Sequence, residues 1–164
     1  MQTQGITAAL SVSDQIDERD VDALATAGFK AVVCHRPDAE GGVPSGRISA
    51  ACAQHGMKFF FQPVAYSGLG VADGDTFGQI LQQCEEPVLA YCRSGRRSTA
   101  LWAIAAAPLA GVQAVVERAG RMGVALDELR PVLVQSAGRK DPPYAPSTDP
   151  AARERFVRLW IGGD

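Results

Sequence analysis

The sequence has little of what metal sites and membrane spans require. Its 164 residues contain two histidines and four cysteines, and no two cysteines stand in a Cys-x-x-Cys pair. Structural zinc sites usually draw their ligands from such close pairs, so we expect no metal and no other cofactor. No apolar stretch approaches the ~20 residues of a membrane-spanning helix, and Gln2 and Gln4 interrupt the segment where a signal peptide would be apolar. We therefore expect a soluble, cytoplasmic protein with free thiols.

An excess of charge of one sign is also missing. The chain has 16 Lys and Arg against 18 Asp and Glu, for a net charge of -2. This balance offers no electrostatic basis for binding nucleic acid or an anionic membrane surface, so we expect neither partner. The content of 46% hydrophobic and 21% charged residues is ordinary for a globular protein of one domain.

Short apolar runs alternate with helical patterns along most of the chain. The strands are expected over 6–12, 29–34, 57–62 and 88–91, and the helices over 17–28, 45–56, 73–84, 99–107, 112–122 and 126–135. Strands that alternate with helices form a parallel sheet with helices on its faces, so the sequence predicts an α/β fold. Pro131 conflicts with the last helix.

Prolines dominate the segment that follows. Residues 136–150 include Pro142, Pro143, Pro146 and Pro150, which favour a linker. Residues 151–161 can form a short amphipathic helix with Phe156, Leu159 and Trp160 on one face. We therefore predict a domain over 1–135 and a linker with a short C-terminal helix over 136–164.

The most informative segment is the loop after the strand at 88–91. It reads Cys92-Arg93-Ser94-Gly95-Arg96-Arg97-Ser98 and leads into a helix. Open α/β sheets bind ligands at the carboxyl ends of their strands. The N–H groups of a tight loop and of a helix N-terminus favour an anion, and they also stabilise a thiolate. Cys92 is therefore the predicted nucleophile, unless it is a plain core cysteine beside solvated arginines.

The other loop residues predict the anion site around Cys92. Arg97 can clamp an oxyanion with two parallel hydrogen bonds, and Ser98 can donate to the sulfur or to the leaving group. Gly95 allows a positive φ. Arg93 and Arg96 add positive potential at the mouth, and Ser94 completes the predicted substrate-binding loop. A catalytic role requires Cys92 to be accessible, whereas a non-catalytic anion-binding module requires the loop alone.

A second group of candidates follows the strand at 29–34, on the same rim. Arg36 can orient the substrate or bind Asp38, and Asp38 is the best remaining acid unless it is only a turn residue after a proline. His35 can move a proton, although a partly exposed loop histidine is the simpler interpretation. Cys34 can resolve an oxidised Cys92 or be a plain thiol at the strand end.

Three pieces of the sequence, in order, resemble one known family. They are Leu10 to Ile16, Arg36-Pro37-Asp38-Ala39-Glu40, and Tyr91 to Ser98 with Ala100-Leu101-Trp102. The sequence resembles, over roughly residues 5 to 135, the phosphatase-like domain of beta-lactamase hydrolase-like proteins (DUF442). The resemblance implies a fold like that of dual-specificity protein tyrosine phosphatases. Family members are called phosphatases by analogy, or sulfurtransferases where they accompany persulfide-oxidising enzymes.

The sequence departs from the phosphatase pattern in two respects. Tyrosine phosphatases have a Cys-x5-Arg loop, whereas Cys92 and Arg97 form Cys-x4-Arg, the loop length of rhodaneses. The loop that supplies the phosphatase general acid corresponds to 64–70, which contains no acid. We therefore favour a sulfurtransferase that carries sulfur as a Cys92 persulfide, from thiosulfate or a persulfide to an acceptor thiol such as glutathione. The alternative is a phosphatase that forms a Cys92 phosphocysteine from a phosphate ester.

Overall fold

The computed structural model describes residues 1–144, 149–160 and 162, and a five-stranded sheet organises them. The strands are β1 (Thr3–Gly5), β2 (Leu10–Ser13), β3 (Ala31–Cys34), β4 (Lys58–Phe61) and β5 (Val88–Tyr91). They lie in the order β1-β2-β5-β3-β4, and β2, β5, β3 and β4 run parallel. The predicted α/β fold with a central parallel sheet is confirmed.

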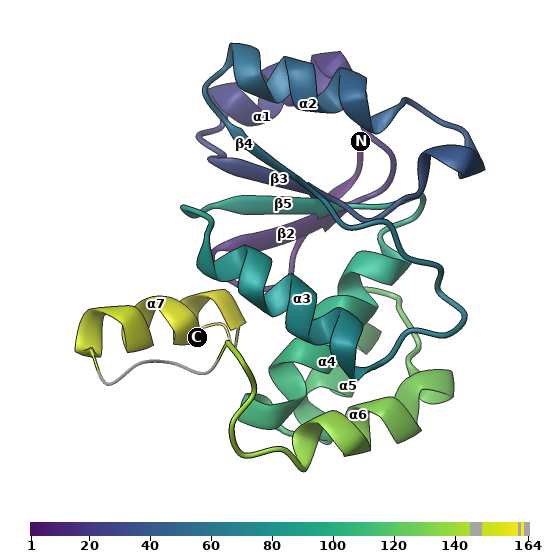
Figure 1. Cartoon of the computed structure of the whole chain (residues 1–164), viewed down its shortest axis with the longest axis vertical. Helices are drawn as coiled ribbons and strands as arrows, with labels where there is room; N and C mark the ends of the chain where they lie inside the picture. The colour runs from purple at the N-terminus through teal and green to yellow at the C-terminus, as the bar shows by residue number, and fades with distance from the viewer. Residues whose placement is uncertain (145–148, 161, 163–164) are drawn as a thin grey trace.

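Helices cover both faces of the sheet (Figure 1). They are α1 (Glu18–Thr26), α2 (Ser45–Gln54), α3 (Val71–Gln82), α4 (Arg96–Ala110), α5 (Val112–Arg121), α6 (Arg130–Ala137) and α7 (Pro150–Trp160). Helices α1 and α2 lie on one face, and α3 to α6 lie on the other. None of the helices in the described part of the chain is both long and apolar enough to cross a bilayer.

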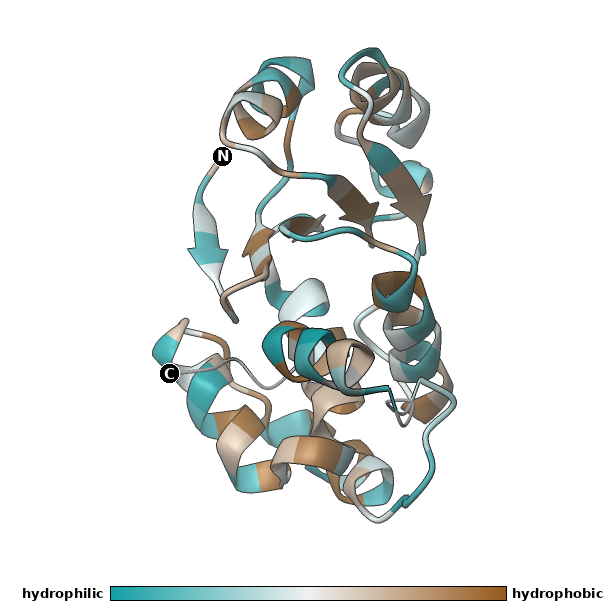
Figure 2. Ribbon diagram, turned by 90° about the vertical axis from the view of Figure 1, so that its left-hand side faces the viewer, coloured by the Kyte–Doolittle hydropathy of each residue, from teal (hydrophilic) through white to brown (hydrophobic). Residues whose placement is uncertain are grey.

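The central strands are buried on both faces because their side chains alternate. Val33 and Ala90 belong to the cluster under α3 and α4, whereas Val32 and Leu89 belong to the cluster under α1 and α2. All four are fully buried. Figure 2 shows the apolar strands between the helical layers. Such continuous apolar strands are typical of a sheet covered on both sides, and they place the carboxyl ends of β2, β3 and β5 on one rim.

The N-terminal strand was predicted in part. The strand predicted over 6–12 is observed as β2, which begins only at Leu10, and an additional strand, β1, pairs antiparallel with it across a tight turn. The hydroxyl of Thr7 accepts a hydrogen bond from the N–H of Leu10 at 3.0 Å and stabilises that turn. β1 is exposed and polar, so its sequence carries no apolar alternation, and pairing with β2 determines its conformation.

Helix α4 is longer than predicted and lies in the centre of the layer formed by α3 to α6. It runs from Arg96 to Ala110 rather than over 99–107, and it contains Pro108. Every residue from Arg97 to Ala107 is buried. A Cβ on Gly74 of α3 would approach Cγ2 of Ile104 to 2.5 Å, so the two helices depend on a glycine for their close contact. This packing holds the first turn of α4, and with it the loop at 92–98, in place.

The segment after 135 contributes to the core. The hydroxyl of Tyr144 is buried and donates to the carbonyl of Ala105 at 2.7 Å, and Phe156 and Leu159 join the same apolar cluster. Helix α7 therefore packs on the domain, although Pro146 and the side chain of Trp160 lie outside the described residues. The predicted helix over 126–135 is divided into a 3-10 turn at Asp127–Leu129 and α6, where Pro131 occupies the first turn and has no N–H to lose.

Candidate active site

The loop after β5 forms a cradle of N–H groups around the sulfur of Cys92. The N–H of Gly95 donates to Sγ of Cys92 at 3.1 Å, and Gly95 has a φ of 89°. In the described structure, the N–H groups of Ser94, Arg97 and Ser98 make no backbone hydrogen bond. These groups stand at the N-terminus of α4, where unpaired donors and the helix dipole favour an anion.

Cys92 is buried, whereas a catalytic role was expected to require an accessible thiol. Cys92 is 1% exposed and lies at the base of the cradle. Its own N–H donates to the carbonyl of Ser13, at the end of β2, at 3.4 Å. The loop closes over the sulfur because Gly95 takes a backbone conformation that L side chains rarely adopt.

Arg97 is buried and is held by Glu40. The guanidinium donates from Nη1 to Oε2 of Glu40 at 2.6 Å and from Nη2 to Oε1 at 2.7 Å. Nη1 also donates to the carbonyl of Val64 at 2.9 Å. The contact with Glu40 raises the pKa of Arg97, burial lowers it, and the neighbouring Cys92 raises it further. A guanidinium has five N–H donors, and the contacts with Glu40 and Val64 use three of them, so two remain for Cys92 or for an oxyanion.

Arg36 supports this contact rather than facing the anion site. Its Nη1 donates to Oε1 of Gln15 at 2.9 Å, its Nη2 donates to the carbonyl of Glu40 at 3.1 Å, and its Nε lies 3.5 Å from Oε1 of Glu40. The predicted role of Arg36 in substrate binding therefore gains no support from the geometry. Gln15, Arg36, Glu40 and Arg97 form one chain of polar contacts that joins the three family-like pieces of the sequence.

Asp38 is hydrogen-bonded to Ser45 at the start of α2. Its Oδ1 accepts the N–H of Ser45 at 2.7 Å, and its Oδ2 accepts the Ser45 hydroxyl at 2.8 Å. These hydrogen bonds lower the pKa of Asp38. Ser45 is the first residue of α2, and Asp38 caps it. A carboxylate held in this way is a poor proton donor, so the geometry does not favour the predicted catalytic role of Asp38.

His35 is fully buried, so the prediction of a partly exposed loop histidine was wrong. Its Nδ1 lies 2.7 Å from the hydroxyl of Ser98, and its ring packs edge-on against Phe77. Burial lowers the pKa of His35 to about 3, against a smaller raising effect of Gln62. Nε2 of His35 and Oε1 of Gln62 are buried and make no hydrogen bond of ordinary geometry to described residues. Ser98, predicted as a donor to the sulfur, therefore contacts a neutral imidazole.

Basic residues line a cavity beside the Cys92 loop. The cavity, of about 400 Å³, is lined by Glu40, Ala65, Tyr66, Ser67, Arg93, Ser94, Arg96 and Arg97. Arg93 is exposed, and the half-exposed Arg96 stacks on the ring of Tyr66 at 3.8 Å and lies 3.8 Å from Glu128. The hydroxyl of Tyr66 is buried and has no hydrogen-bond partner among the described residues. Arg96 is half-exposed, in contrast to the buried Arg97.

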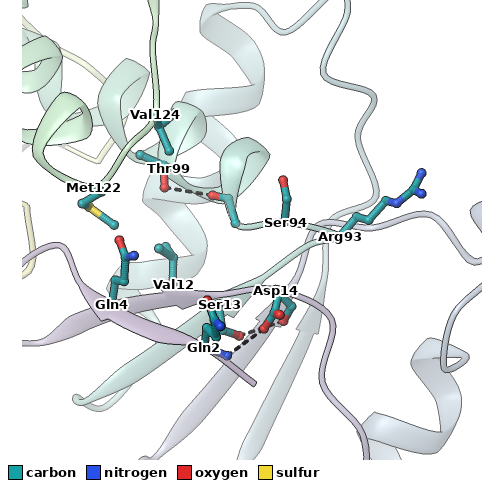
Figure 3. A pocket seen from close by; sticks show the side chains of 11 residues that line it. Gln2, Gln4, Val12, Ser13, Asp14, Arg93, Ser94, Thr99, Met122 and Val124 are labelled. Atoms are coloured by element: carbon teal, nitrogen blue, oxygen red, sulfur yellow. Dashed lines mark hydrogen bonds between the residues drawn. The ribbon is translucent and has the colours of Figure 1, made fainter.

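A second cavity, of about 300 Å³, shares the loop with the first (Figure 3). Arg93, Ser94 and Gly95 line it together with Gln2, Gln4, Val12, Ser13, Asp14, Thr99, Met122 and Val124. Oδ1 of Asp14 accepts the N–H of Gln2 at 2.9 Å. In Figure 3, the side chain of Arg93 extends away from Gln2 and Gln4, so its guanidinium lies at the outer rim of the loop.

The other cysteines and the acids provide no further reactive centre. Burial raises the pKa of Cys34, whose Sγ donates to the carbonyl of Arg36 at 3.4 Å. Burial also raises the pKa of Cys52 to about 11 and that of Cys84 to about 12. Among the described residues, no three His, Cys, Asp or Glu side chains gather closely enough to hold a metal ion.

A parallel sheet with a Cys-loop at the carboxyl end of a central strand defines a phosphatase-like, cysteine-based enzyme fold. Residues 2–109 match the family described as beta-lactamase hydrolase-like protein, phosphatase-like domain, and the chain belongs to this family. The beta-lactamase hydrolase-like protein of Agrobacterium fabrum is 30% identical over 106 residues, which make up 63% of this chain and 25% of that protein. The chain thus spans about a quarter of that relative.

Solved structures show the same fold. A provisionally assigned phosphatase of Neisseria meningitidis is 34% identical, with a TM-score of 0.71 over 80% of this chain and 96% of that one. Tk-PTP is 18% identical, with a TM-score of 0.66 over 82% of this chain and 95% of that one. TpbA of P. aeruginosa, in complex with pTyr, is 19% identical, with a TM-score of 0.59 over 97% and 88% of the two chains. The last two establish the fold alone.

Proposed function

We propose that this protein is a phosphatase that hydrolyses a phosphate ester through a Cys92 phosphocysteine. The observation that carries the proposal is the placement of a cysteine sulfur under a cradle of N–H groups, with Arg97 held at its side by Glu40. The remaining donors of Arg97 and the N–H groups of the loop are suited to the three outer oxygens of a phosphoryl group. The phosphotyrosine bound by TpbA supports a small anionic substrate of this kind.

The chemistry has two steps. The Cys92 thiolate attacks phosphorus, the S–P bond forms, and the bond to the leaving oxygen breaks. Water then attacks the phosphocysteine, and the electron pair of the S–P bond returns to sulfur. The loop N–H groups and Arg97 stabilise the charge on the outer oxygens in both transition states, the largest single contribution in many such sites.

Sulfur transfer, the function favoured from the sequence, is the second candidate. The Cys-x4-Arg loop and the absence of an acid in 64–70 favour it, but the family and the structural neighbours are described as phosphatase-like. An acceptor thiol such as glutathione gains no support from them. The third candidate, a non-catalytic anion-binding module, uses the same cradle without a reaction at Cys92.

The test compares the two reactions on one preparation. We expect para-nitrophenyl phosphate to be hydrolysed by the native protein and not by Cys92→Ser. Acid quenching followed by mass spectrometry should detect a phosphoryl group on Cys92. In a parallel sample, thiosulfate or glutathione persulfide should leave Cys92 without an added sulfur. A single added sulfur, with no hydrolysis of any phosphate, would replace the phosphatase proposal by sulfur transfer.

Two arginine variants form a matched pair for the anion site. Arg97→Lys retains the charge but loses the fork that binds Glu40 and an oxyanion at once, so we expect kcat/KM to fall by about 10²-fold or more. Arg96→Lys should lose far less, because Arg96 stacks on Tyr66 at the rim. Equal losses in the two variants, measured on the same substrate, would show that Arg97 is not the clamp.

A further inference from the structure

The cavity beside the Cys92 loop holds, among the described residues, no acid that is suited to protonating a leaving group. Glu40 is the one acidic residue among the described residues that line this cavity. Both of its carboxylate oxygens accept hydrogen bonds from Arg97, and this contact lowers the pKa of Glu40. A carboxylate held ionised by a guanidinium has no proton to give.

The other nearby carboxylates accept hydrogen bonds from groups outside this cavity. Asp38 caps α2 at Ser45, and Oδ2 of Asp73 accepts the N–H of Gly70 at the start of α3. Asp14 lines the other cavity, where it holds the N–H of Gln2. The loop over 64–70 contains no Asp or Glu. None of these carboxylates in the described part of the chain is therefore placed to give a proton to the leaving group.

His35 and Tyr66 do not replace the missing acid. His35 is fully buried and its Nδ1 contacts the hydroxyl of Ser98, so the imidazole has no open path to a leaving group. The hydroxyl of Tyr66 is buried as well, and Arg96 covers one face of its ring. A proton donor has to reach the departing oxygen directly or through one water.

The mouth of the cavity favours a leaving group that carries its own negative charge. Three arginines and one glutamate line it. Glu40 neutralises Arg97, which leaves Arg93 and Arg96 at the rim. The contact of Arg96 with Glu128 is long, at 3.8 Å, and the carboxylate of Glu128 is 77% exposed, so it compensates this charge weakly. The rim is therefore complementary to an anion beyond the transferred phosphoryl group.

We propose that the substrates are phosphoanhydrides, in which a second phosphate is the leaving group, and this proposal rests on the phosphatase function above. The thiolate of Cys92 attacks the terminal phosphorus, and the S–P bond forms as the bridging P–O bond breaks. The electron pair of that bond stays on the bridging oxygen, and phosphate departs as an anion beside Arg93 and Arg96. Water then cleaves the S–P bond, the pair returns to sulfur, and the proton of the water goes to solvent. No acid is needed, because phosphate is a far weaker base than an alkoxide.

The experiment measures kcat/KM against the basicity of the leaving group. The substrates are dinitrophenyl, para-nitrophenyl and phenyl phosphate, an alkyl phosphate, and inorganic pyrophosphate, with Cys92→Ser as the blank. General acid catalysis typically contributes 10²–10⁴-fold. Without general acid catalysis, we expect kcat/KM for phenyl phosphate to be lower than that for dinitrophenyl phosphate by about 10²-fold or more. We expect kcat/KM for the alkyl phosphate to be lower still. Pyrophosphate should be hydrolysed at least as well as para-nitrophenyl phosphate.

Variants test separately the absence of a general acid and the identity of the leaving group as phosphate. Asp14→Asn should leave the dependence on leaving-group basicity unchanged. Arg93→Gln combined with Arg96→Gln should lower kcat/KM for pyrophosphate several-fold more than for para-nitrophenyl phosphate. An equal loss on both substrates, or pyrophosphate left intact while aryl phosphates react, overturns the phosphoanhydride assignment.

The phosphoanhydride assignment is also overturned if kcat/KM of the native protein varies little with leaving-group basicity but varies steeply in Asp14→Asn or Tyr66→Phe. The residue replaced in that variant is then the acid. In all these outcomes the phosphatase function survives. Hydrolysis of no substrate above the Cys92→Ser blank is the separate result that rejects the phosphatase function itself.

Discussion

The buried imidazole of His35 should make the stability of the protein depend on pH above the range in which carboxylates titrate. Burial lowers the pKa of His35 from 6.5 to about 3 in the folded protein, whereas the unfolded chain regains the ordinary value. Between these values the unfolded state binds a proton that the folded state does not. The free energy of unfolding therefore falls as the pH falls below 6.5, by about 1.4 kcal/mol per pH unit.

The size of the effect follows from the pH range between the folded and unfolded pKa values of His35. Lowering the pH from about 6.5 to about 5 should cost about 2 kcal/mol through this one group, a large part of the stability of an ordinary domain. The pKa values of Asp38, Glu40 and Glu86 are lowered, so the stability that these carboxylates provide is lost below this window. Arg97 adds a smaller effect in the same direction as burial.

The assay is urea unfolding at about pH 7, 6 and 5. His35→Asn can keep a polar contact with Ser98 and cannot titrate, so its free energy of unfolding should be nearly level across these pH values. His55, the other histidine, lies partly exposed beside Asp22, and His55→Asn provides the matched control that should retain the slope. If His35→Asn shows the same slope as the native protein, the imidazole is protonated in the folded state and the reasoning fails.

Two further substitutions examine the support of the site. Glu40→Gln removes the carboxylate that holds both ends of the Arg97 fork, so we expect kcat/KM to fall by about 10- to 100-fold while the fold is retained. Unchanged kinetics with a native circular dichroism spectrum would show that Arg97 needs no partner. Asp38→Asn should lower the melting temperature modestly through the weakened cap at Ser45 and leave kcat/KM within roughly a few-fold. The low pKa of Asp38 means that its contribution to stability is lost as the pH falls through that value, so the variant should lose less stability in acid. A loss of activity by the full general-acid factor of about 10²–10⁴ would assign the acid role to Asp38 after all.

Much of the fold could be predicted because the central strands are buried on both faces. Apolar runs such as 88–91 have few alternatives to a covered parallel strand, and the glycine-containing loop after them marks the site. β1 could not be predicted, because Thr3 to Gly5 are exposed and only pairing with β2 orders them. The limits of α4 were also missed, since tertiary packing carries the helix past Pro108.

The site itself was predicted in part. The positions of Cys92 after β5 and of Arg97 in the first turn of α4 follow from local sequence, because a short loop joins this strand to this helix. The partner of Arg97 is Glu40, 57 residues away, and no spacing rule connects two such positions. Glu40 stood inside one of the family-like pieces, and this was the signal available for it. His35 packs against the ring of Phe77, which also lies on a distant element of the sequence.

The chain of contacts from Gln15 through Arg36 and Glu40 to Arg97 has a consequence for protein engineering. A transplant of the seven-residue loop 92–98 into another strand–helix junction would carry the sulfur and the N–H groups but leave the guanidinium without its carboxylate. The smallest portable unit is therefore the set of three neighbouring strand ends, β2, β5 and β3, with the segments that follow them. A designer who copies all three can exchange the outer helices, whereas one who copies the loop alone obtains an anion binder without a clamp.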